Sequence, residues 1–374
     1  MKILFDPQIF LWQKTGGVSR FCAELYDLLI KNSENEIVFP VFFSENKHLT
    51  ELGYSTIFLN WFLKFNLTSR IVGKYKFSLN HLLINSLLSL NKYDLYFQSY
   101  YETYFLDAIG DTPFVVTIHD MIHELYPTES TNYLIKNKKI LIEKSTRIIV
   151  VSHNTKRDIL KFYPSVKEDK IDVVYLSHSI KHTSYKVNSL NMPQQYILYV
   201  GGRGGYKNFY FFIHAVSNWL LENKFSLLCL GGGIFNQEEL KLINQLSIDQ
   251  ITYQITCLDS ELFEYYSKAF VFVFPSLYEG FGIPILESMA CGCPVVLPYT
   301  SSFPEIAGDA GIYFESESQS SLVEKLDLLK NDYHFLEMKR GQGISQTKKF
   351  SWEKTVNGCN DVFKKAVLQH KLKT

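Results

Sequence analysis

The sequence predicts an α/β protein of two doubly wound domains, each a parallel sheet with helices on both faces. Short, continuously apolar segments alternate with segments of helical periodicity along the whole chain. A polar stretch between Leu176 and Pro193 interrupts this alternation, so we place the hinge between the domains there. The chain has 374 residues, which is long enough for two such domains, and we expect them to span residues 1–180 and 194–351.

Each predicted strand is a short apolar run. In the first domain the runs are Lys2–Phe5, Ile37–Phe43, Leu95–Gln98, Phe114–Ile118 and Arg147–Val151. In the second domain they are Tyr196–Val200, Ser226–Leu230, Ile251–Ile255, Phe270–Phe274 and Pro294–Leu297. Ligands of doubly wound folds gather at the carboxyl ends of the strands, so the residues that follow these runs are the first candidates for a site.

Composition excludes several classes of protein. Hydrophobic residues make up 46% and charged residues 20% of the chain, as in an ordinary globular protein. The formal net charge is zero, so no overall field favours nucleic acid, and we expect no nucleic-acid partner. The start of the chain is predicted as a strand and not a signal peptide, and no apolar run approaches the roughly 20 residues that span a bilayer. We therefore expect a reducing, cytoplasmic location, with the cysteines acting mainly as buried apolar residues.

Two carboxylates lie eight residues apart around a Gly-Phe-Gly turn in the second domain. Glu279 precedes the turn, and Glu287 is expected about one turn into the helix that Pro284 begins. Backbone N–H groups of the glycines and of the helix N-terminus suit an anionic ligand, while Glu287 can accept hydrogen bonds from sugar hydroxyls. A strand, a loop and a helix with surface carboxylates would show the same spacing.

A second glycine-rich loop follows the predicted strand Tyr196–Val200. It contains Arg203 among the glycines of residues 201–205, and Lys207 two residues after them. A pyrophosphate needs positive charge and close backbone approach, and such a loop provides both. The loop matches neither the dinucleotide-binding fingerprint nor the P-loop. A solvated loop with flexible basic side chains is the alternative, but the nearby Glu279 motif in the same domain favours the pyrophosphate.

Two strand ends in the first domain add candidates. Gly16 and Gly17 open a helix predicted from Val18 to Ile30, where their backbone N–H groups would meet a phosphate or a bound sugar. A simple tight turn explains them equally well. His119 and Asp120 follow another strand, a good position for chemistry, although a polar pair within a turn would have the same sequence.

The sequence predicts no metal site. Cys291-Gly-Cys293 has no second cysteine pair, as a zinc site of this kind would need. His123 follows His119 by four residues, which would suit a metal on a helix, but Pro127 and the preceding strand oppose a helix there.

A basic, aromatic segment lies between residues 52 and 93 and contains no acidic residue. Its basic residues are Lys64, Arg70, Lys74, Lys76 and Lys92, and its interleaved aromatic residues include Trp61, Phe62, Phe65 and Phe77. A solvated helix pair with an aromatic core face would give this pattern. The other interpretation is a surface that touches anionic lipid or a lipid-linked diphosphate.

With these motifs the chain resembles the retaining glycosyltransferases of family 4, which have the GT-B fold. The similar segments are Glu279–Glu287 with the following Ala290–Val296, Gly201–Arg203 with Lys207–Asn208, Thr15–Gly17, Thr117–Asp120 and Pro304–Ile306. The chain resembles most closely the bacterial transferases that build O-antigen and exopolysaccharide, many of them mannosyltransferases. The resemblance implies two Rossmann-like domains facing a cleft, with residues 352–374 forming a helix that crosses back onto the first domain.

The resemblance also implies roles. Arg203 and Lys207 would neutralise the leaving diphosphate, although many members have a longer gap between the two basic residues. Glu279 would face the donor sugar and stabilise its oxocarbenium-like state. Glu287 would bind the ribose hydroxyls, and His119 would reach the transferred sugar from the first domain. The leaving phosphate itself would take the acceptor proton on the same face, which accounts for retention.

The remaining implied substrate-binding residues lie in the same motifs. They are Gly16, Gly17, Asp120, Gly202, Phe281, Gly282 and Ile283. The backbone amides of Gly282 and Ile283 would contact the sugar or the β-phosphate. The chain contains no Asp-x-Asp pair, which agrees with chemistry that needs neither a metal nor a cofactor.

The expected function is transfer of a sugar from a nucleotide diphosphate sugar, with GDP-mannose implied by resemblance, in surface polysaccharide synthesis. The acceptor would be a glycan or a polyprenyl-diphosphate-linked oligosaccharide, with the first domain binding it and the second binding the donor. Peripheral contact with the inner face of the plasma membrane would follow from the basic, aromatic segment. The alternatives are a UDP- or dTDP-sugar donor such as glucose or rhamnose, a sugar-nucleotide epimerase of the same fold, and a non-catalytic sugar-nucleotide-binding subunit.

Overall fold

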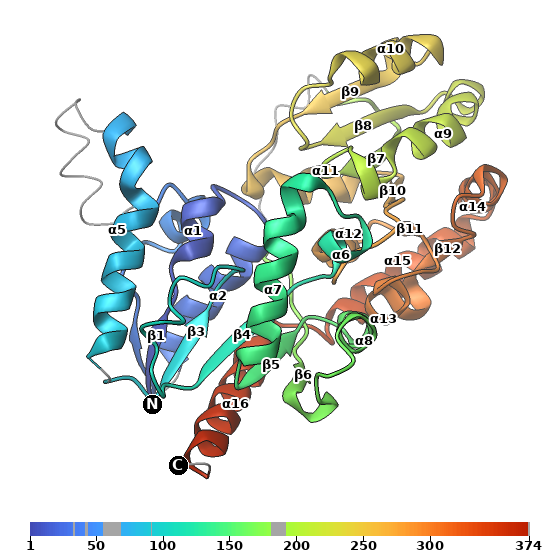
Figure 1. Ribbon diagram of the computed structural model, residues 1–374. Helices are drawn as coiled ribbons and strands as arrows, with labels where there is room; N and C mark the ends of the chain where they lie inside the picture. Colours follow the sequence, from blue (N-terminus) through green and yellow to red (C-terminus); the bar gives the residue numbers. More distant parts are fainter. Residues whose placement is uncertain (33, 42–43, 55–68, 91, 181–191, 373–374) are drawn as a thin grey trace. The chain divides into compact units, whose positions relative to one another are not determined.

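The computed structural model describes residues 1–372 except 33, 42–43, 55–68, 91 and 181–191, with the backbone alone for 32 and 69–76. The chain divides into two compact units (Figure 1). Unit 1 contains Met1–Leu176 and Trp352–Thr374, and unit 2 contains Ser177–Ser351. Each unit is built around its own parallel sheet of six strands. The predicted α/β class, with two doubly wound sheets, is therefore confirmed.

Unit 1 has the strand order β2-β1-β3-β4-β5-β6, with every neighbouring pair parallel. The strands are β1 Lys2–Phe5, β2 Glu36–Val38, β3 Leu95–Gln98, β4 Phe114–Ile118, β5 Arg147–Val150 and β6 Ile171–Val173. The central strands β3 and β4 are buried along their whole length, because helices cover both faces of the sheet. This explains their continuous apolar sequence.

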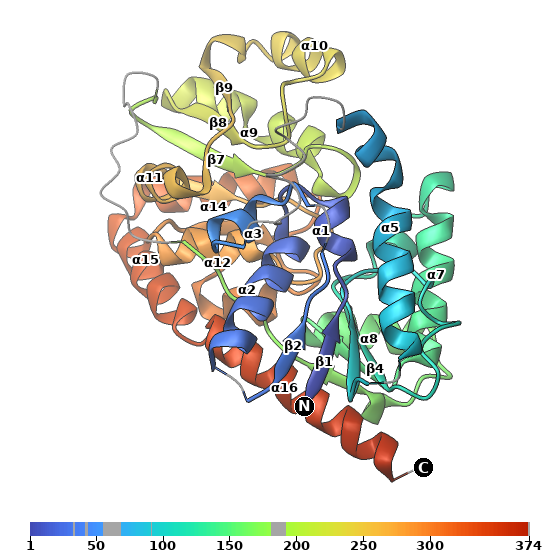
Figure 2. The same ribbon diagram turned by 90° about the vertical axis from the view of Figure 1, so that its left-hand side faces the viewer.

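The helices of unit 1 are α1 Gln8–Trp12, α2 Gly17–Asn32, α3 Lys47–Glu51, α5 Ser69–Ser89, α6 Ile122–Leu125, α7 Asn132–Lys144, α8 His153–Phe162 and α16 Trp352–Lys371. Short 3-10 turns span Glu129–Thr131 and Glu168–Lys170. Ser152 caps α8 by accepting a hydrogen bond from the Thr155 N–H. The last helix, α16, packs beside α2 (Figure 2). It also contacts β3, β4 and β5. Its Phe363 ring lies 5.3 Å from the ring of Phe97. The predicted return of the C-terminal helix to the first sheet is confirmed.

Unit 2 has the strand order β12-β11-β10-β7-β8-β9, again all parallel. The strands are β7 Tyr196–Val200, β8 Ser226–Leu230, β9 Thr252–Ile255, β10 Val271–Val273, β11 Val295–Pro298 and β12 Ile312–Phe314. Since β7 lies between β8 and β10, the loops that follow these three strands meet at one edge of the sheet.

The helices of unit 2 are α9 Phe209–Asn223, α10 Gln237–Gln245, α11 Leu262–Lys268, α12 Ile283–Ala290, α13 Phe303–Ala307, α14 Gln319–Asn331 and α15 Tyr333–Thr347. The 3-10 turns are Gly205–Lys207, Asp249–Ile251, Asp259–Glu261 and Gly308–Ala310. Apolar residues of α9, α14, β7 and β8 form one core cluster. Trp219 joins two of these helices, because its indole N–H donates to Asp327 at 2.7 Å.

Two strands, β6 and β12, were not predicted from the sequence. Both β6 and β12 are edge strands of three residues, and Asp172 interrupts the apolar character of β6. The strand predicted at Ile37–Phe43 is shorter than expected, since β2 ends at Val38, and residues 42–43 lie outside the description. The cysteines are free thiols; five are buried and Cys257 is partly exposed.

Most of the side chains that define the basic, aromatic segment lie outside the described residues. Trp61, Phe62, Lys64 and Phe65 belong to the undescribed range 55–68, and the side chains of Arg70, Lys74 and Lys76 are likewise not described. Phe77 lies on α5 and packs edge-on against Trp12, with ring centroids 5.6 Å apart. Contact with a membrane surface therefore stays a prediction. None of the described helices is long and apolar enough to cross a membrane.

Candidate functional site

The predicted donor loops of unit 2 meet through an ion pair. Lys207 lies in the 3-10 turn after β7, and Glu279 lies in the loop between β10 and α12. The Lys207 Nζ is 2.6 Å from Glu279 Oε1. The backbone joins the same loops, because the Leu277 N–H donates to the Tyr206 carbonyl at 2.8 Å. The pairing of β7 with β10 thus brings together two residues that are 72 positions apart in the sequence.

The loop after β11 holds the backbone of Glu279. Ser301 accepts a hydrogen bond from the Glu279 N–H at 3.0 Å, and its hydroxyl donates to the Glu279 carbonyl at 2.6 Å. The Ser302 hydroxyl donates to the carbonyls of Glu279 and Phe281, each at 3.0 Å. Sequence reasoning missed both serines. They are positioned by the neighbouring strand β11, and nothing in their local sequence distinguishes them from ordinary loop serines.

Glu287 lies in the first turns of α12 and is buried. The helix begins at Ile283, with Pro284 at the second position instead of the predicted first. Gly282 precedes it with a φ of +94°, where a Cβ would lie 2.8 Å from the Ile285 side chain, so glycine is required. The Tyr266 hydroxyl on α11 donates to Glu287 Oε2 at 3.2 Å. This tyrosine, which orients the carboxylate, was not predicted from the sequence.

Phe281 and Gly202 lie in the same two loops of unit 2 as Glu279 and Lys207. The buried Phe281 ring packs edge-on against Phe350, with centroids 5.9 Å apart. The Gly202 carbonyl accepts a hydrogen bond of 2.5 Å from the Tyr199 hydroxyl. Burial raises the pKa of Tyr199 far above its ordinary range, so this hydroxyl remains a donor at neutral pH.

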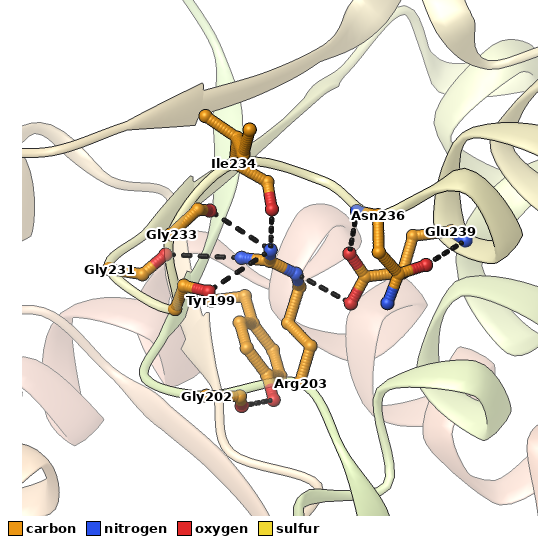
Figure 3. A network of polar contacts seen from close by, with 9 residues as sticks. Tyr199, Gly202, Arg203, Gly231, Gly233, Ile234, Asn236 and Glu239 are labelled. Atoms are coloured by element: carbon orange, nitrogen blue, oxygen red, sulfur yellow. Dashed lines mark hydrogen bonds and ion pairs between the residues drawn. The ribbon is translucent and has the colours of Figure 1, made fainter.

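Arg203 is placed differently from the sequence-based expectation. Its side chain is only 3% exposed, and its Nε donates to Glu239 Oε1 at 2.9 Å (Figure 3). The remaining guanidinium N–H groups donate to backbone carbonyls of the loop after β8, at Gly231, Gly232, Gly233 and Ile234. The guanidinium therefore binds groups of the protein itself. Arg203 is not the flexible, solvated side chain that the alternative interpretation of this loop describes.

Glu239 was not identified from the sequence, although a signal existed. It follows Asn236 by three residues, the spacing of a capping box at a helix start. The structure contains that box: the Asn236 side chain accepts from the Glu239 N–H, and Glu239 Oε2 accepts from the Asn236 N–H, both at 2.8 Å. The other oxygen of the same carboxylate neutralises Arg203.

His119 and Asp120 follow β4 in unit 1, as predicted. The backbone N–H of His119 donates to the Tyr101 hydroxyl at 3.1 Å, and the imidazole packs edge-on against Phe21. Burial lowers the pKa of His119 to about 4, so the ring is neutral at pH 7. Its Nε2 is buried and finds no hydrogen-bond partner among the described residues.

A buried ion pair supports the same loop. Lys138 on α7 lies 2.8 Å from Glu124, and its Nζ also donates to the Asp120 carbonyl at 3.1 Å. The Asp120 carboxylate accepts a hydrogen bond from the backbone N–H of Ile122, the first residue of α6. Sequence reasoning missed the lysine, because a lysine between an asparagine and a second lysine gives no signal of burial.

Gly16 and Gly17 lie at the start of α2, but the Gly16 amide already has a partner. Its N–H donates to His48 Nε2 at 3.3 Å. Gly16 has a φ of +154°, a backbone conformation that residues with a Cβ rarely adopt, which explains the glycine. Gly17 is the first residue of α2. The structure therefore supports the tight-turn interpretation for Gly16 and leaves ligand binding at the pair a prediction.

The predicted residues thus fall into two sets, one in each unit. In unit 2, Gly202, Arg203, Lys207, Glu279, Phe281, Gly282, Ile283 and Glu287 follow β7 and β10 at the same edge of the sheet. In unit 1, Gly16, Gly17, His119 and Asp120 follow β1 and β4. The unit 2 group combines an ammonium, two carboxylates and a helix N-terminus, which are the groups that bind phosphate and sugar hydroxyls.

Two family models match the sequence. Residues 15–177 match the model described as Glycosyltransferase Family 4, and residues 181–348 match the model described as Glycosyl transferases group 1. O-antigen chain mannosyltransferase B of Escherichia coli is 27% identical over 266 residues, which are 67% of this chain and 70% of that protein. O-antigen chain mannosyltransferase RfbU of Salmonella typhimurium is 28% identical over 209 residues, 55% of this chain and 58% of that protein.

Solved structures share the fold at low sequence identity. Sucrose-phosphate synthase from Thermosynechococcus elongatus superposes with a TM-score of 0.72 at 17% identity, covering 97% of this chain and 98% of that one. Anabaena Alr3699/HepE, solved in complex with UDP and glucose, has a TM-score of 0.71 at 14% identity, with 96% and 98% of the two chains covered.

Proposed function

Because this chain belongs to the glycosyltransferases of family 4 and group 1 and has their GT-B fold, we propose that it transfers mannose from GDP-mannose to a growing surface glycan with retention of configuration. That it is a glycosyltransferase follows from its family; the donor and the acceptor are the proposal. Two relatives are O-antigen mannosyltransferases, which favours mannose. The observation that carries the proposal is the contact between Lys207 and Glu279.

The two charges suit the separation of charge in sugar transfer. As the bond between sugar and diphosphate breaks, positive charge develops on the sugar and negative charge on the leaving diphosphate. Lys207 would compensate the diphosphate and Glu279 would stabilise the sugar, in a site where fixed charges need little reorganisation. The side chains of Lys207 and Glu279 are 21% and 13% exposed, so a bound donor can reach both while water screens them only partly.

The rest of the donor site in unit 2 would hold the nucleotide. Glu287, oriented by Tyr266, would accept hydrogen bonds from the ribose hydroxyls. The amides of Gly282 and Ile283, at the N-terminus of α12, would contact the sugar or the β-phosphate. Gly202 and Phe281 would complete this surface. We therefore propose residues 194–351 as the nucleotide-sugar-binding domain.

The first domain, residues 1–180 with 352–374, would bind the acceptor. His119 would offer its neutral Nε2 to a hydroxyl of the transferred sugar, without adding charge. Asp120, Gly16 and Gly17 would contribute further polar contacts at this strand edge. The acceptor we propose is a glycan or a polyprenyl-diphosphate-linked oligosaccharide, and the leaving phosphate would accept its proton. No metal and no cofactor take part in this scheme.

A UDP-hexose is the second candidate donor, because a structure of the same fold was solved with UDP and glucose. Thermal-shift measurements with GDP, UDP and dTDP, each with and without EDTA, separate the candidates. Stabilisation by GDP alone that survives EDTA supports the proposal, and stabilisation by UDP alone moves the donor to the second candidate. The next measurement is radiolabelled transfer from GDP-mannose to a polyprenyl-diphosphate-linked oligosaccharide, with Glu279→Gln as the inactive control. No nucleotide binding and no transfer would contradict the proposed function.

A further inference from the structure

A turn after β8 points its carbonyl groups at a single guanidinium. Gly231, Gly232 and Gly233 have φ values of +76°, +69° and +75°, the left-handed region that favours glycine. The Arg203 Nη1 donates to the Gly231 carbonyl at 3.1 Å, and its Nη2 donates to the Gly233 and Ile234 carbonyls at 2.9 and 3.0 Å (Figure 3). We name residues 231–234 the glycine turn.

The charge of Arg203 is already compensated within the protein. Its Nε binds Glu239, which is as deeply buried as the arginine itself. The guanidinium carbon lies 4.7 Å from the centroid of the Phe235 ring and 5.9 Å from that of Phe209. A guanidinium with an ionic partner, carbonyl acceptors and aromatic neighbours would lose all of these contacts if it turned toward a phosphate.

The glycine turn lies at the same sheet edge as the proposed donor site. It follows β8, which pairs with β7, the strand before Lys207. In a trans peptide the C=O and N–H groups point in opposite directions, so carbonyls that face Arg203 leave the amides of 232–235 facing away from it. Gly232, Gly233 and Ile234 are exposed, and successive amides of this kind form concave anion-binding surfaces.

We infer that Arg203 is a positioning residue, which holds the glycine turn so that its backbone amides are available to the phosphates of the donor, and does not itself bind them. The inference rests on the proposed function, since it assigns a role within the nucleotide-sugar site. It revises the sequence-based role of Arg203 as a direct partner of the diphosphate. Glu239 then belongs to the site as well, because it fixes the orientation of the guanidinium.

The two roles predict opposite effects of neutralising Glu239. If Arg203 binds the diphosphate directly, Glu239→Gln removes a competing negative charge, and nucleoside diphosphates should bind as tightly or more tightly. If Arg203 positions the glycine turn, Glu239→Gln loosens the guanidinium and binding should weaken. Arg203→Lys discriminates in the same way: it keeps the charge but loses the planar fork, so it should impair a positioning role nearly as much as Arg203→Met.

The experiment measures dissociation constants of GDP, UDP and dTDP by calorimetry for the wild type, Arg203→Lys, Arg203→Met and Glu239→Gln. Glu324→Gln is the matched control, because Glu324 is 70% exposed on α14 and pairs with Lys325. We expect each of the three test variants to raise the dissociation constant of the diphosphate that the wild type binds by about tenfold or more. The control should leave this constant unchanged. In kinetics the KM for the donor should rise while the KM for the acceptor stays constant, a split that a loss of folded protein cannot produce.

A variant that fails to fold does not decide the matter alone, so thermal unfolding accompanies each titration. Gly232→Ala is the second test of the turn, because its Cβ would lie 2.6 Å from Arg203 Nη1 and 2.7 Å from the Gly201 carbonyl. Gly232→Ala should weaken binding of the same diphosphate, although Arg203 and its charge remain. Unchanged or tighter binding by Glu239→Gln, or full retention of affinity in Arg203→Lys, would overturn the inference while the proposed function stands. Absence of binding by the wild type would overturn both.

Discussion

Lys207 Nζ and Glu279 Oε1 are 2.6 Å apart, so the cation predicted for the diphosphate and the carboxylate predicted for the sugar are direct partners. They come from loops after two adjacent strands, β7 and β10. A bound donor would compete with Glu279 for the ammonium. The two residues therefore act as a unit, and changing one alters what the other can do.

This pairing predicts that substitutions of Lys207 and of Glu279 have different effects on diphosphate binding. Lys207→Met should weaken nucleoside diphosphate binding, because a charge-assisted contact is lost. Glu279→Gln should bind the diphosphate at least as tightly as the wild type, since the lysine is released from its carboxylate partner. The same variant should lose about 2–4 kcal/mol of transition-state stabilisation. Calorimetry and kcat measurements on both variants check this. Weaker diphosphate binding by Glu279→Gln would contradict it.

Glu287 should determine whether the site recognises the ribose. The wild type should bind GDP more tightly than 2′,3′-dideoxy-GDP, by about tenfold for the lost hydrogen bonds. Glu287→Ala should bind both nucleotides equally weakly. Tyr266→Phe, which removes the 3.2 Å hydrogen bond to Glu287 but keeps the carboxylate, should retain part of the preference. The measurement is competition between the two nucleotides, and an undiminished preference in Glu287→Ala would exclude the ribose role.

His119 should make the protein less stable in acid. Burial holds its pKa at about 4, below the ordinary value of 6.5, so the unfolded chain binds the proton more readily than the folded chain. The free energy of unfolding should therefore fall as the pH drops from about 6.5 toward 4, and at pH 5 this single histidine would account for about 2 kcal/mol.

His119→Gln is the variant that isolates this contribution. Urea unfolding at pH 7 and pH 5 should show a smaller loss of stability on acidification for His119→Gln than for the wild type. Equal losses for the two proteins would show that His119 is not buried in its neutral form.

The buried ion pair of Lys138 with Glu124 should be essential to the stability of unit 1. The two side chains are 0% and 3% exposed, so Lys138→Met leaves an uncompensated buried carboxylate and should cost about 3–5 kcal/mol. Lys139→Met is the matched control on the same helix: this lysine is 57% exposed, and its removal should cost less than about 1 kcal/mol. Chemical denaturation measures both.

A second substitution tests the cause of that loss. In Lys138→Met combined with Glu124→Leu, no buried charge remains, and much of the lost stability should return. If the double variant is no more stable than Lys138→Met alone, the uncompensated carboxylate is not the cause of the loss.

The sequence by itself determined the fold class, most of the strands and the loops that contain the site. These features are local: a buried parallel strand is a continuous apolar run, and glycines mark the turn that follows it. The run Tyr196–Val200 and the loop after it could therefore be predicted from adjacent residues. The edge strands β6 and β12 could not, because three residues that are only partly buried give too weak a pattern.

Only the tertiary structure decided which charges meet. Arg203 and Lys207 are similar basic residues of one loop, yet the first turns inward to Glu239 and the second reaches Glu279. Lys138 likewise lies in a helix whose neighbouring Lys139 is exposed, yet it is completely buried. The physical reason is that a charge is stabilised by whatever group lies within a few ångströms of it. That neighbour is set by the order of strands in the sheet, and the order of residues along the chain does not specify it.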